Sequence, residues 1–177
     1  VSPERVAERL CAFNAPDMRA QTQWFDGVLI ISDCCNASPD ATITSLQSLN
    51  DIKCVNRRYA VIGDMHELGE HAEKYHRAVG ASMAEAHIDF LCTIGENAEY
   101  VREEAENRGI AAKTFESADD IAEFLNRKLE KNDGLIVKGS RLCKLESVLL
   151  KFKEMRSAAR EAAVESEDLV REGGNDV

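Results

Sequence analysis

The sequence has no apolar run close to the roughly 18 residues that a membrane-spanning helix requires. Its first ten residues, VSPERVAERL, have neither the basic flank nor the apolar stretch of a signal peptide. Positive charge is scarce as well, because 22 Lys and Arg stand against 32 Asp and Glu, giving a net charge of -10. Binding to a nucleic-acid backbone needs clustered Lys and Arg. We therefore expect a cytoplasmic protein that contacts neither a membrane nor a nucleic acid.

Several metal and nucleotide motifs are missing too. The six cysteines are scattered without a CxxC pair, so we expect reduced thiols that pack as small apolar groups. The patterns GxxxxGK[ST], GxGxxG and GxSxG do not occur, which removes a self-contained phosphate loop and weakens dinucleotide and serine-hydrolase functions. In HELGEH the residues His66 and His71 are five apart, about 140° around a helix, so they cannot form a zinc-protease pair. We expect no metal site in this chain.

What the sequence does contain is an alternation of short apolar runs with amphipathic segments. The apolar runs predict strands at 19–25, 28–32, 59–64, 89–95, 112–115 and 134–139, the first two joined by a tight Asp26-Gly27 turn. Helical spacing of apolar residues predicts helices at 3–13, 70–86 and 96–108, and others beginning near 39, 117 and 142. Strands that alternate with helices imply right-handed crossovers. The predicted fold is a three-layer α/β/α, Rossmann-like domain with a mostly parallel sheet and an N-terminal β-hairpin.

This pattern divides the chain into three parts. Residues 1–15 form a helix and a break, 16–155 form the α/β domain, and 156–177 form an acidic tail. Residues 161–177 hold six acids against one Arg and few large apolar groups, so we expect a disordered, solvated tail. The chain does not begin with Met, and we expect a fragment or a processed product.

The predicted strands end in polar segments: SDCCNASP, GDMHELGE, GENAE and KGSR. In a parallel sheet, ligands bind outside the carboxyl ends of the strands. We therefore expect the functional site at these segments.

Four of these features, in order, resemble the C-terminal domain of the Mur ligase family. FNAPDMR is similar to the family's linker, which ends in Arg, and VLIISDCCNASPDA to a strand followed by D-x-Y-N-A-N-P-x-S. VIGDMHELGE with YHRAVG is similar to G-D-M-x-E-L-G and H-x-x-V-G, and DGLIVKGSR with the following LE resembles G-D-x-x-L-V-K-G-S-R with M-E. The resemblance runs from about Pro16 to Phe152, and the helix before it resembles the end of the family's central domain. The quoted motifs fit best the family members that add D-alanyl-D-alanine.

The resemblance implies an ATP-dependent amide ligation in peptidoglycan precursor synthesis. In that reaction a carboxylate of UDP-MurNAc-tripeptide becomes an acyl phosphate, which the amine of D-alanyl-D-alanine attacks. The N-terminal and central ligase domains, which carry the phosphate loop and most contacts to ATP and Mg²⁺, have no counterpart in this sequence. We expect them as partners, and we expect the chain alone to be inactive.

The resemblance also assigns roles to residues. Arg19 is implied as the catalytic residue that contacts ATP phosphates, Asp33 as the acceptor for the ribose hydroxyls, and Asn36 as a residue lining the nucleotide side. Asp33 as a strand-end cap and Asn36 as a turn former are the structural alternatives.

A second group is implied to bind the incoming dipeptide. Asp64 and Glu67 shape a loop that faces it, although the same loop can be a satisfied turn. Lys138, Ser140 and Arg141 offer donors to a peptide carboxylate, with a surface pair between Arg141 and Glu146 as the alternative for Arg141.

His76, outside this implied group, is expected to be a packed or loop-bonded histidine and not a base.

The sequence departs from the family at three positions. Cys35 replaces a Tyr, Ser38 replaces an Asn, and Met18 replaces the Gly before the Arg. The change at Cys35 removes an aromatic surface, and the change at Met18 alters the hinge. The Cys35 replacement and the acidic tail keep open a non-catalytic module that has kept the fold. A related ligase with the same domain, of the folylpolyglutamate or cyanophycin synthetase type, is a further alternative.

Overall fold

The structure is a computed structural model that describes residues 2–11, 16–53 and 55–173. The strands are β1 Gln21–Phe25, β2 Val28–Asp33, β3 Arg58–Gly63, β4 Phe90–Ile94, β5 Ala111–Thr114 and β6 Gly134–Lys138. The α-helices are α1 Pro3–Cys11, α2 Pro39–Asp51, α3 Ala72–Glu85, α4 Ala98–Asn107, α5 Ala118–Lys128 and α6 Glu146–Gly173. Short 3-10 turns at Gly69–His71 and Arg141–Cys143 precede α3 and α6. This alternation is the one that the sequence predicts.

The six strands form one sheet in the order β1-β2-β6-β3-β4-β5. Only the β1–β2 pair is antiparallel, and the other neighbours run parallel. The turn of this hairpin has positive φ at both central residues, Asp26 (48°) and Gly27 (78°), as a tight two-residue turn requires. The mostly parallel sheet and the N-terminal hairpin are thus confirmed.

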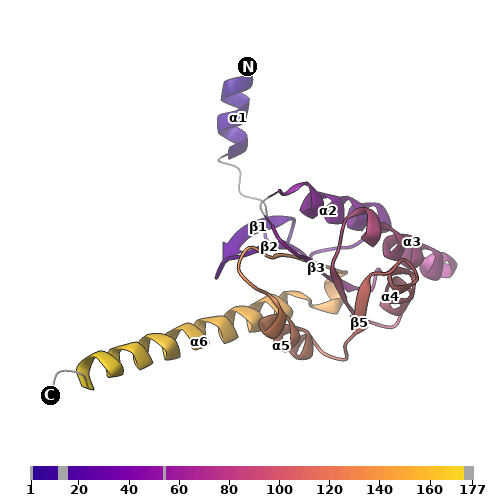
Figure 1. Cartoon of the computed structure of the whole chain (residues 1–177). Helices are drawn as coiled ribbons and strands as arrows, with labels where there is room; N and C mark the ends of the chain where they lie inside the picture. The colour runs from indigo at the N-terminus through magenta and orange to yellow at the C-terminus, as the bar shows by residue number, and fades with distance from the viewer. Residues whose placement is uncertain (1, 12–15, 54, 174–177) are drawn as a thin grey trace.

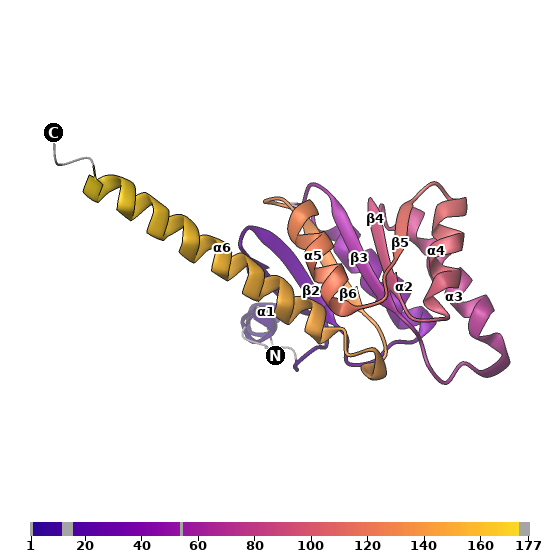
Figure 2. The same cartoon turned by 90° about the horizontal axis from the view of Figure 1, so that it is seen from below.

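Helices cover both faces of the sheet, which makes three layers (Figure 1). Alternate residues of each central strand point to opposite faces, and each face has its own apolar core. On one face Ile30, Val61 and Val137 pack with residues of α5 and α6. On the other face Ile31 and Ile136 pack with residues of α2, α3 and α4. Figure 2, seen from below, shows α5 and α6 on one side of the strands.

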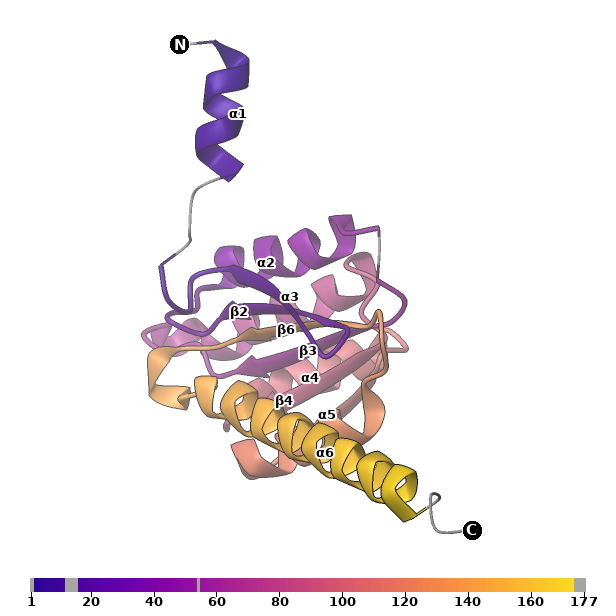
Figure 3. The same cartoon turned by 90° about the vertical axis from the view of Figure 1, so that its left-hand side faces the viewer.

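The C-terminal helix α6 differs from the sequence prediction of a disordered tail over 156–177. It continues as helix to Gly173 and projects past the edge of the sheet (Figures 1 and 3). Phe152 is fully buried, whereas residues 157–164 are exposed. Ala, Glu and Leu between 158 and 173 favour helix even without a packing partner, which the charge-based expectation overlooked. Residues 174–177 lie outside the described part.

The N-terminal helix α1 lies apart from the sheet and its helices (Figure 3). Its residues up to Arg9 are exposed. Residues 12–15, where the sequence predicts the break before the domain, lie outside the described residues. No helix in the described part of the chain is both long enough and apolar enough to cross a membrane.

Candidate functional site

The carboxyl ends of three neighbouring strands bring the predicted site residues to one edge of the sheet. β6 lies between β2 and β3, so Asp33, Lys138 and Asp64 end or follow adjacent strands. The polar segments separated by up to 105 residues in sequence therefore meet in space, as the parallel topology predicts.

A pocket of about 310 Å³ opens beside the end of β2. Its lining contains four of the predicted site residues, Arg19, Asp33, Asn36 and Lys138, with Ala20, Cys35, Ser38 and Ala41. The resemblance implied that Lys138 belongs to the dipeptide-binding group. In the structure it lines the pocket together with Arg19, Asp33 and Asn36, the residues implied for the nucleotide. Lys138 and Asp33, which form an ion pair, both line this pocket.

The Asp33 carboxylate joins three segments of the chain. Lys138 Nζ donates to Asp33 Oδ2 at 2.7 Å, and Ser45 Oγ of α2 donates to the same oxygen at 2.6 Å. The backbone N–H of Ala20 donates to Asp33 Oδ1 at 3.1 Å. The side chains of Lys138 and Asp33 are only 3% and 15% exposed, and such poorly hydrated charges require a partner. The predicted capping role of Asp33 at the strand end and a ligand role are therefore compatible.

Arg19 lies in a linker whose backbone is held in an unusual conformation. Met18 and Ala20 on either side have φ of 57° and 51°, in the left-handed region that costs a non-glycine residue energy. Two hydrogen bonds keep this conformation: Cys35 N–H donates to Met18 O at 3.1 Å, and Ala20 N–H donates to Asp33. Arg19 itself is exposed, and its guanidinium has no partner among the described residues.

Cys34 and Cys35 lie in different surroundings, one in the core and one at the pocket. Cys34 is fully buried in the core, and burial raises the pKa of its thiol. Cys35 lines the pocket, and Arg141 Nη1 donates to Cys35 Sγ at 3.6 Å. The described part of the chain has no ion pair between Arg141 and Glu146, so the alternative pairing for Arg141 is not found there. Arg141 is exposed beside the pocket.

The loop after β3 is held by groups from three other segments. Asp64 Oδ1 accepts from Ala98 N–H at 2.7 Å, so this carboxylate caps the N-terminus of α4. Ser140 Oγ accepts from His66 N–H at 3.1 Å. Asp64 and Ser140 are 8% and 5% exposed, whereas Glu67 is exposed and has a φ of 64°. This loop is thus a satisfied turn, the structural alternative for Asp64, with Glu67 presented to solvent.

His76 on α3 bonds to the same loop. Its Nε2 accepts from Met65 N–H at 3.0 Å, which leaves Nδ1 to donate to Ala72 O at 2.8 Å. The ring is fully buried. The expectation of a packed, loop-bonded histidine is confirmed.

The four cysteines with described side chains, Cys34, Cys35, Cys92 and Cys143, are free thiols. Burial raises the pKa of Cys92 to about 12, and burial followed by the charge of Asp64 raises the pKa of Cys143. Cys11 and Cys54 lie outside the residues whose side chains are described. Within the described residues, His, Cys, Asp and Glu form no group of three that could hold a metal ion.

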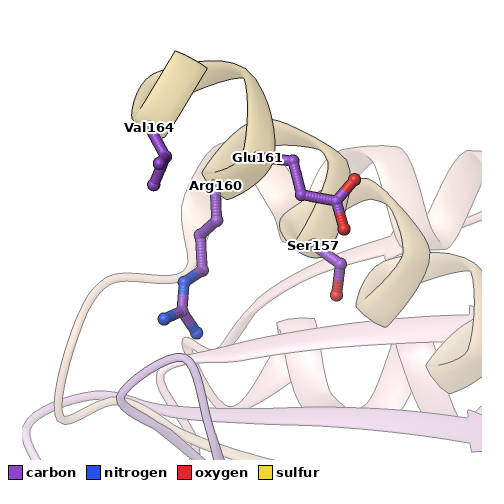
Figure 4. Close-up of a pocket in the computed structure, with 4 residues that line it drawn as sticks. All are labelled: Ser157, Arg160, Glu161 and Val164. Carbon is purple, nitrogen blue, oxygen red and sulfur yellow. The ribbon is translucent and has the colours of Figure 1, made fainter. Parts of the chain in front are cut away.

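A larger hollow, of about 450 Å³, lies beside α6, away from the strand ends (Figure 4). Its described lining consists of Ser157, Arg160, Glu161 and Val164, which share one face of the helix. In Figure 4 the Arg160 side chain points from α6 toward the neighbouring loops. All four side chains are exposed. The smaller pocket, which collects residues from four segments of the chain, is the better candidate site.

Two features of the pocket were missed by the sequence reasoning. Ser45 bonds to Asp33 from the second turn of α2, and Lys138 pairs with Asp33 and also donates to Asn36 O at 3.1 Å. No local sequence pattern indicates either of these hydrogen-bonded pairs. The only indication in the sequence was that Asp33 and Lys138 both lie at the ends of predicted strands.

Comparisons with known proteins identify the family of this chain. Residues 18–141 match the family described as "Mur ligase, glutamate ligase domain". The chain belongs to this Mur ligase family. The matched range contains Arg19, Asp33, Asn36, Asp64, Glu67, Lys138, Ser140 and Arg141.

Among curated relatives with this Mur ligase domain is the UDP-N-acetylmuramoyl-tripeptide–D-alanyl-D-alanine ligase of Bacillus subtilis. It is 29% identical over 154 residues, which are 84% of this chain and 33% of the relative. The corresponding enzyme of Haemophilus influenzae is 29% identical over 129 residues, which are 72% of this chain and 28% of the relative. The chain thus spans about a third of the length of these relatives.

Solved Mur ligase structures share the fold. The MurF ligase of Thermotoga maritima, solved in complex with ADP, has a TM-score of 0.69 and 28% identity, over 82% of this chain and 32% of that one. MurF of Acinetobacter baumannii has a TM-score of 0.74 over 87% of this chain and 34% of its own, and at 24% identity it supports the fold alone.

Proposed function

We propose that the chain is the C-terminal domain of an ATP-dependent ligase that adds D-alanyl-D-alanine to UDP-MurNAc-tripeptide during cytoplasmic peptidoglycan synthesis. The family match and the names of the relatives support this proposal. The observation that carries it is the pocket at the end of β2, which is lined by both the guanidinium of Arg19 and the carboxylate of Asp33. Those two groups are suited to the phosphates and the ribose of one nucleotide.

The Asp33 carboxylate has room for one further hydrogen bond. A carboxylate offers about four acceptor positions on its two oxygens. Three are used: two on Oδ2, by Lys138 and Ser45, and one on Oδ1, by Ala20. Oδ1 can therefore accept from one ribose hydroxyl, and the exposed Asn36 beside it offers an amide to the same ligand.

Arg19 provides the free positive charge of the pocket. Its partnerless, exposed guanidinium can reach phosphate oxygens that another domain brings to the pocket, and it can stabilise the charge that develops during transfer. When bound, ATP would supply its γ-phosphoryl group: an oxygen of the acceptor carboxylate would bond to the γ-phosphorus as the bond from this phosphorus to the departing ADP breaks, which leaves an acyl phosphate. We assign Mg²⁺, like most contacts to ATP, to the central domain.

The incoming dipeptide is assigned to the exposed groups beside the pocket. Arg141 is suited to its carboxylate, and Glu67 on the β3 loop to its ammonium group. The ammonium group first loses one proton to solvent, and the resulting amine attacks the acyl carbon. The amide bond forms, the bond from the acyl carbon to the phosphate oxygen breaks, and phosphate leaves with a second proton from the nitrogen. Holding both reactants in place is the main contribution of this domain.

The full-length protein that contains this chain is the right material for the test. We expect Arg19→Ala to lower kcat/KM for ADP release dependent on D-alanyl-D-alanine about 100-fold, because a transition-state charge loses its partner. Arg127→Ala is the matched control, since Arg127 is exposed on α5, and it should leave the rate unchanged. Equal rates in the Arg19→Ala and unchanged proteins would refute the assignment.

The alternatives predict different results in the same assay. A ligase of the folylpolyglutamate type would release ADP with glutamate as the incoming amine and not with D-alanyl-D-alanine. A non-catalytic module would release none with either. The gene upstream of Val1 gives an independent check, because the proposal requires an in-frame phosphate loop there.

A further inference from the structure

The segment that follows β6 occupies the middle of the functional edge. Lys138, Gly139 and Ser140 lie between the ends of β2 and β3, because β6 is hydrogen-bonded to both of these strands. All three residues are buried, which is unusual for a polar segment that leaves a strand. The side chains of the first and third residues bond in opposite directions.

Lys138 bonds toward the loop after β2. Its ammonium group donates to Asp33 Oδ2 at 2.7 Å and to Asn36 O at 3.1 Å. Two of its three donors are thus committed to protein groups, and the side chain is 3% exposed. This arrangement fixes both ends of the turn from Asp33 to Asn36, and with it the shape of the pocket wall.

Ser140 bonds toward the loop after β3. Its hydroxyl oxygen accepts from His66 N–H at 3.1 Å, and its own N–H donates to Asp64 O at 3.1 Å. The residue is 5% exposed. The two bonds hold the loop on both sides of Met65, whose N–H is bound by His76.

Gly139 lets the segment pass between these loops. A Cβ at this position would lie 2.6 Å from Leu145 Cδ1 and 3.3 Å from the backbone of Gly63. A side chain here would therefore require Leu145 to move and the end of β3 at Gly63 to yield slightly.

We propose that Lys138-Gly139-Ser140 is a bridge that sets the positions of the β2 loop and the β3 loop. Lys138 and Ser140 act as positioning residues, and they do not bind the dipeptide carboxylate as the sequence comparison implied. The structural role of the bridge does not depend on the proposed function. Its consequence for catalysis rests on the proposed function, in which the β2 loop faces the nucleotide and the β3 loop faces the incoming amine.

The first test needs no ligase activity. Amide hydrogen exchange is measured by NMR on the 177-residue chain. In Ser140→Ala the His66 amide loses its acceptor, and we expect its exchange to become about tenfold faster while the Ala98 amide, bound by Asp64, keeps its rate. Ser140→Thr retains the hydroxyl and should restore slow exchange.

The matched control for exchange is Ser48→Ala on α2, whose hydroxyl donates to Thr44 O of the same helix. It should leave the His66 amide unchanged. In Lys138→Met we expect faster exchange at the Ala20 amide, which Asp33 binds, with the His66 amide unchanged. Unchanged exchange at His66 in Ser140→Ala, or faster exchange throughout the domain, contradicts the bridge.

The second test measures kinetics in the full-length protein. Ser140→Ala should raise KM for D-alanyl-D-alanine about tenfold, and leave kcat and KM for ATP within about twofold, because only the β3 loop is released. Ser140→Thr should recover the original KM. An effect on kcat alone contradicts a positioning role.

The two tests distinguish failure of the bridge from failure of the proposed function. Absence of ligase activity, together with the expected exchange pattern, refutes the proposed function and leaves the bridge. Ligase activity with an unchanged exchange pattern in Ser140→Ala refutes the bridge alone.

Discussion

Asp33 shows how one residue can serve both folding and binding. Its carboxylate ties the linker, α2 and β6 together through Ala20, Ser45 and Lys138. Loss of the carboxylate would leave the Lys138 ammonium buried without its charged partner. A reduced activity in an Asp33 variant therefore needs a stability measurement beside it, whereas Arg19, which is exposed, gives the cleaner test.

The left-handed residues beside Arg19 lead to a stability prediction. We expect Ala20→Gly to raise the free energy of unfolding by about 0.5–1 kcal/mol, because glycine adopts the observed φ of 51° without the steric cost that alanine bears. Urea denaturation of the 177-residue chain measures the change.

The matched control is the same substitution at an exposed helical position. Ala78→Gly in the interior of α3 should lower the free energy of unfolding by about 1 kcal/mol. Destabilisation at both positions would contradict the claim that the linker stores strain.

The buried thiol of Cys92 leads to a prediction about alkaline pH. Its pKa is raised from the ordinary value of 9.0 to about 12, so between these values the unfolded thiol releases a proton that the folded one retains. Stability is therefore unaffected below pH 9 and falls as pH rises from 9 to 12, by up to about 1.4 kcal/mol per pH unit from this group.

The measurement compares Cys92→Ala with the unchanged chain by urea denaturation at several pH values. The variant is less stable at pH 8 because it leaves a cavity, but the difference should shrink as pH rises toward 10.5. Cys34 and Cys143 also have raised pKa values and remain in both proteins, so their contributions cancel. A difference that stays constant with pH would contradict the shift.

At the scale of elements, Arg156 fastens α6 to the rest of the domain. Its guanidinium donates to Asp26 Oδ2 in the hairpin turn at 3.0 Å, and to Asn126 O and Leu129 O at the end of α5. It thus joins the hairpin, α5 and α6 at one point. Beyond it, the helix is exposed as far as Val164.

We expect Arg156→Ala to lower the free energy of unfolding by about 2 kcal/mol, because two carbonyls and a half-buried carboxylate lose their donor. Arg160→Ala, one turn further along the exposed face, is the matched control and should change it by less than about 0.5 kcal/mol. Thermal denaturation distinguishes the two. Equal effects would show that the attachment of α6 does not depend on Arg156.

The elements themselves were largely predictable, because apolar periodicity is a local property. The helix expected to begin near residue 117 is present as α5, and its cap Ser117 accepts from Asp120 N–H. The boundaries were less accurate: the helix expected at 70–86 begins as a 3-10 turn and becomes α3 only at Ala72. Short-range hydrogen bonds decide such ends.

The bonds that build the site could not be predicted from spacing. For Asp64 the sequence left a dipeptide-facing loop and a satisfied turn open, and it did not indicate that this carboxylate caps α4 through Ala98, 34 residues away. Lys138 was assigned to the dipeptide, yet it pairs with Asp33 because the sheet order places β6 beside β2. Strand order is a property of the whole sheet, and the sequence pattern did not determine it.

At the scale of the whole molecule, the pocket at the end of β2 presents an exposed Arg19 whose guanidinium has no partner among the described residues, which suits a surface that works against another domain. The proposal expects the other nucleotide contacts from domains outside this chain, which spans about a third of the curated relatives it matches. We expect the chain alone to show no ATP hydrolysis and to bind ADP with a Kd of about 1 mM or weaker.

Calorimetric titration with ADP measures this affinity, and the full-length protein provides the comparison. Micromolar binding by the chain alone would show that the pocket is a complete nucleotide site. That result would favour a free-standing binding module over one part of a ligase.

The sheet order has a consequence for the making of the protein. β6 is the last strand in the chain, yet it lies between β2 and β3. Until the ribosome has released residue 138, the hairpin and the β3-β4-β5 unit lack the strand that joins them, and each has an open edge. Nascent chains that stop before Gly134 should therefore be recognised by chaperones or aggregate, and the domain should fold only near the end of its own translation.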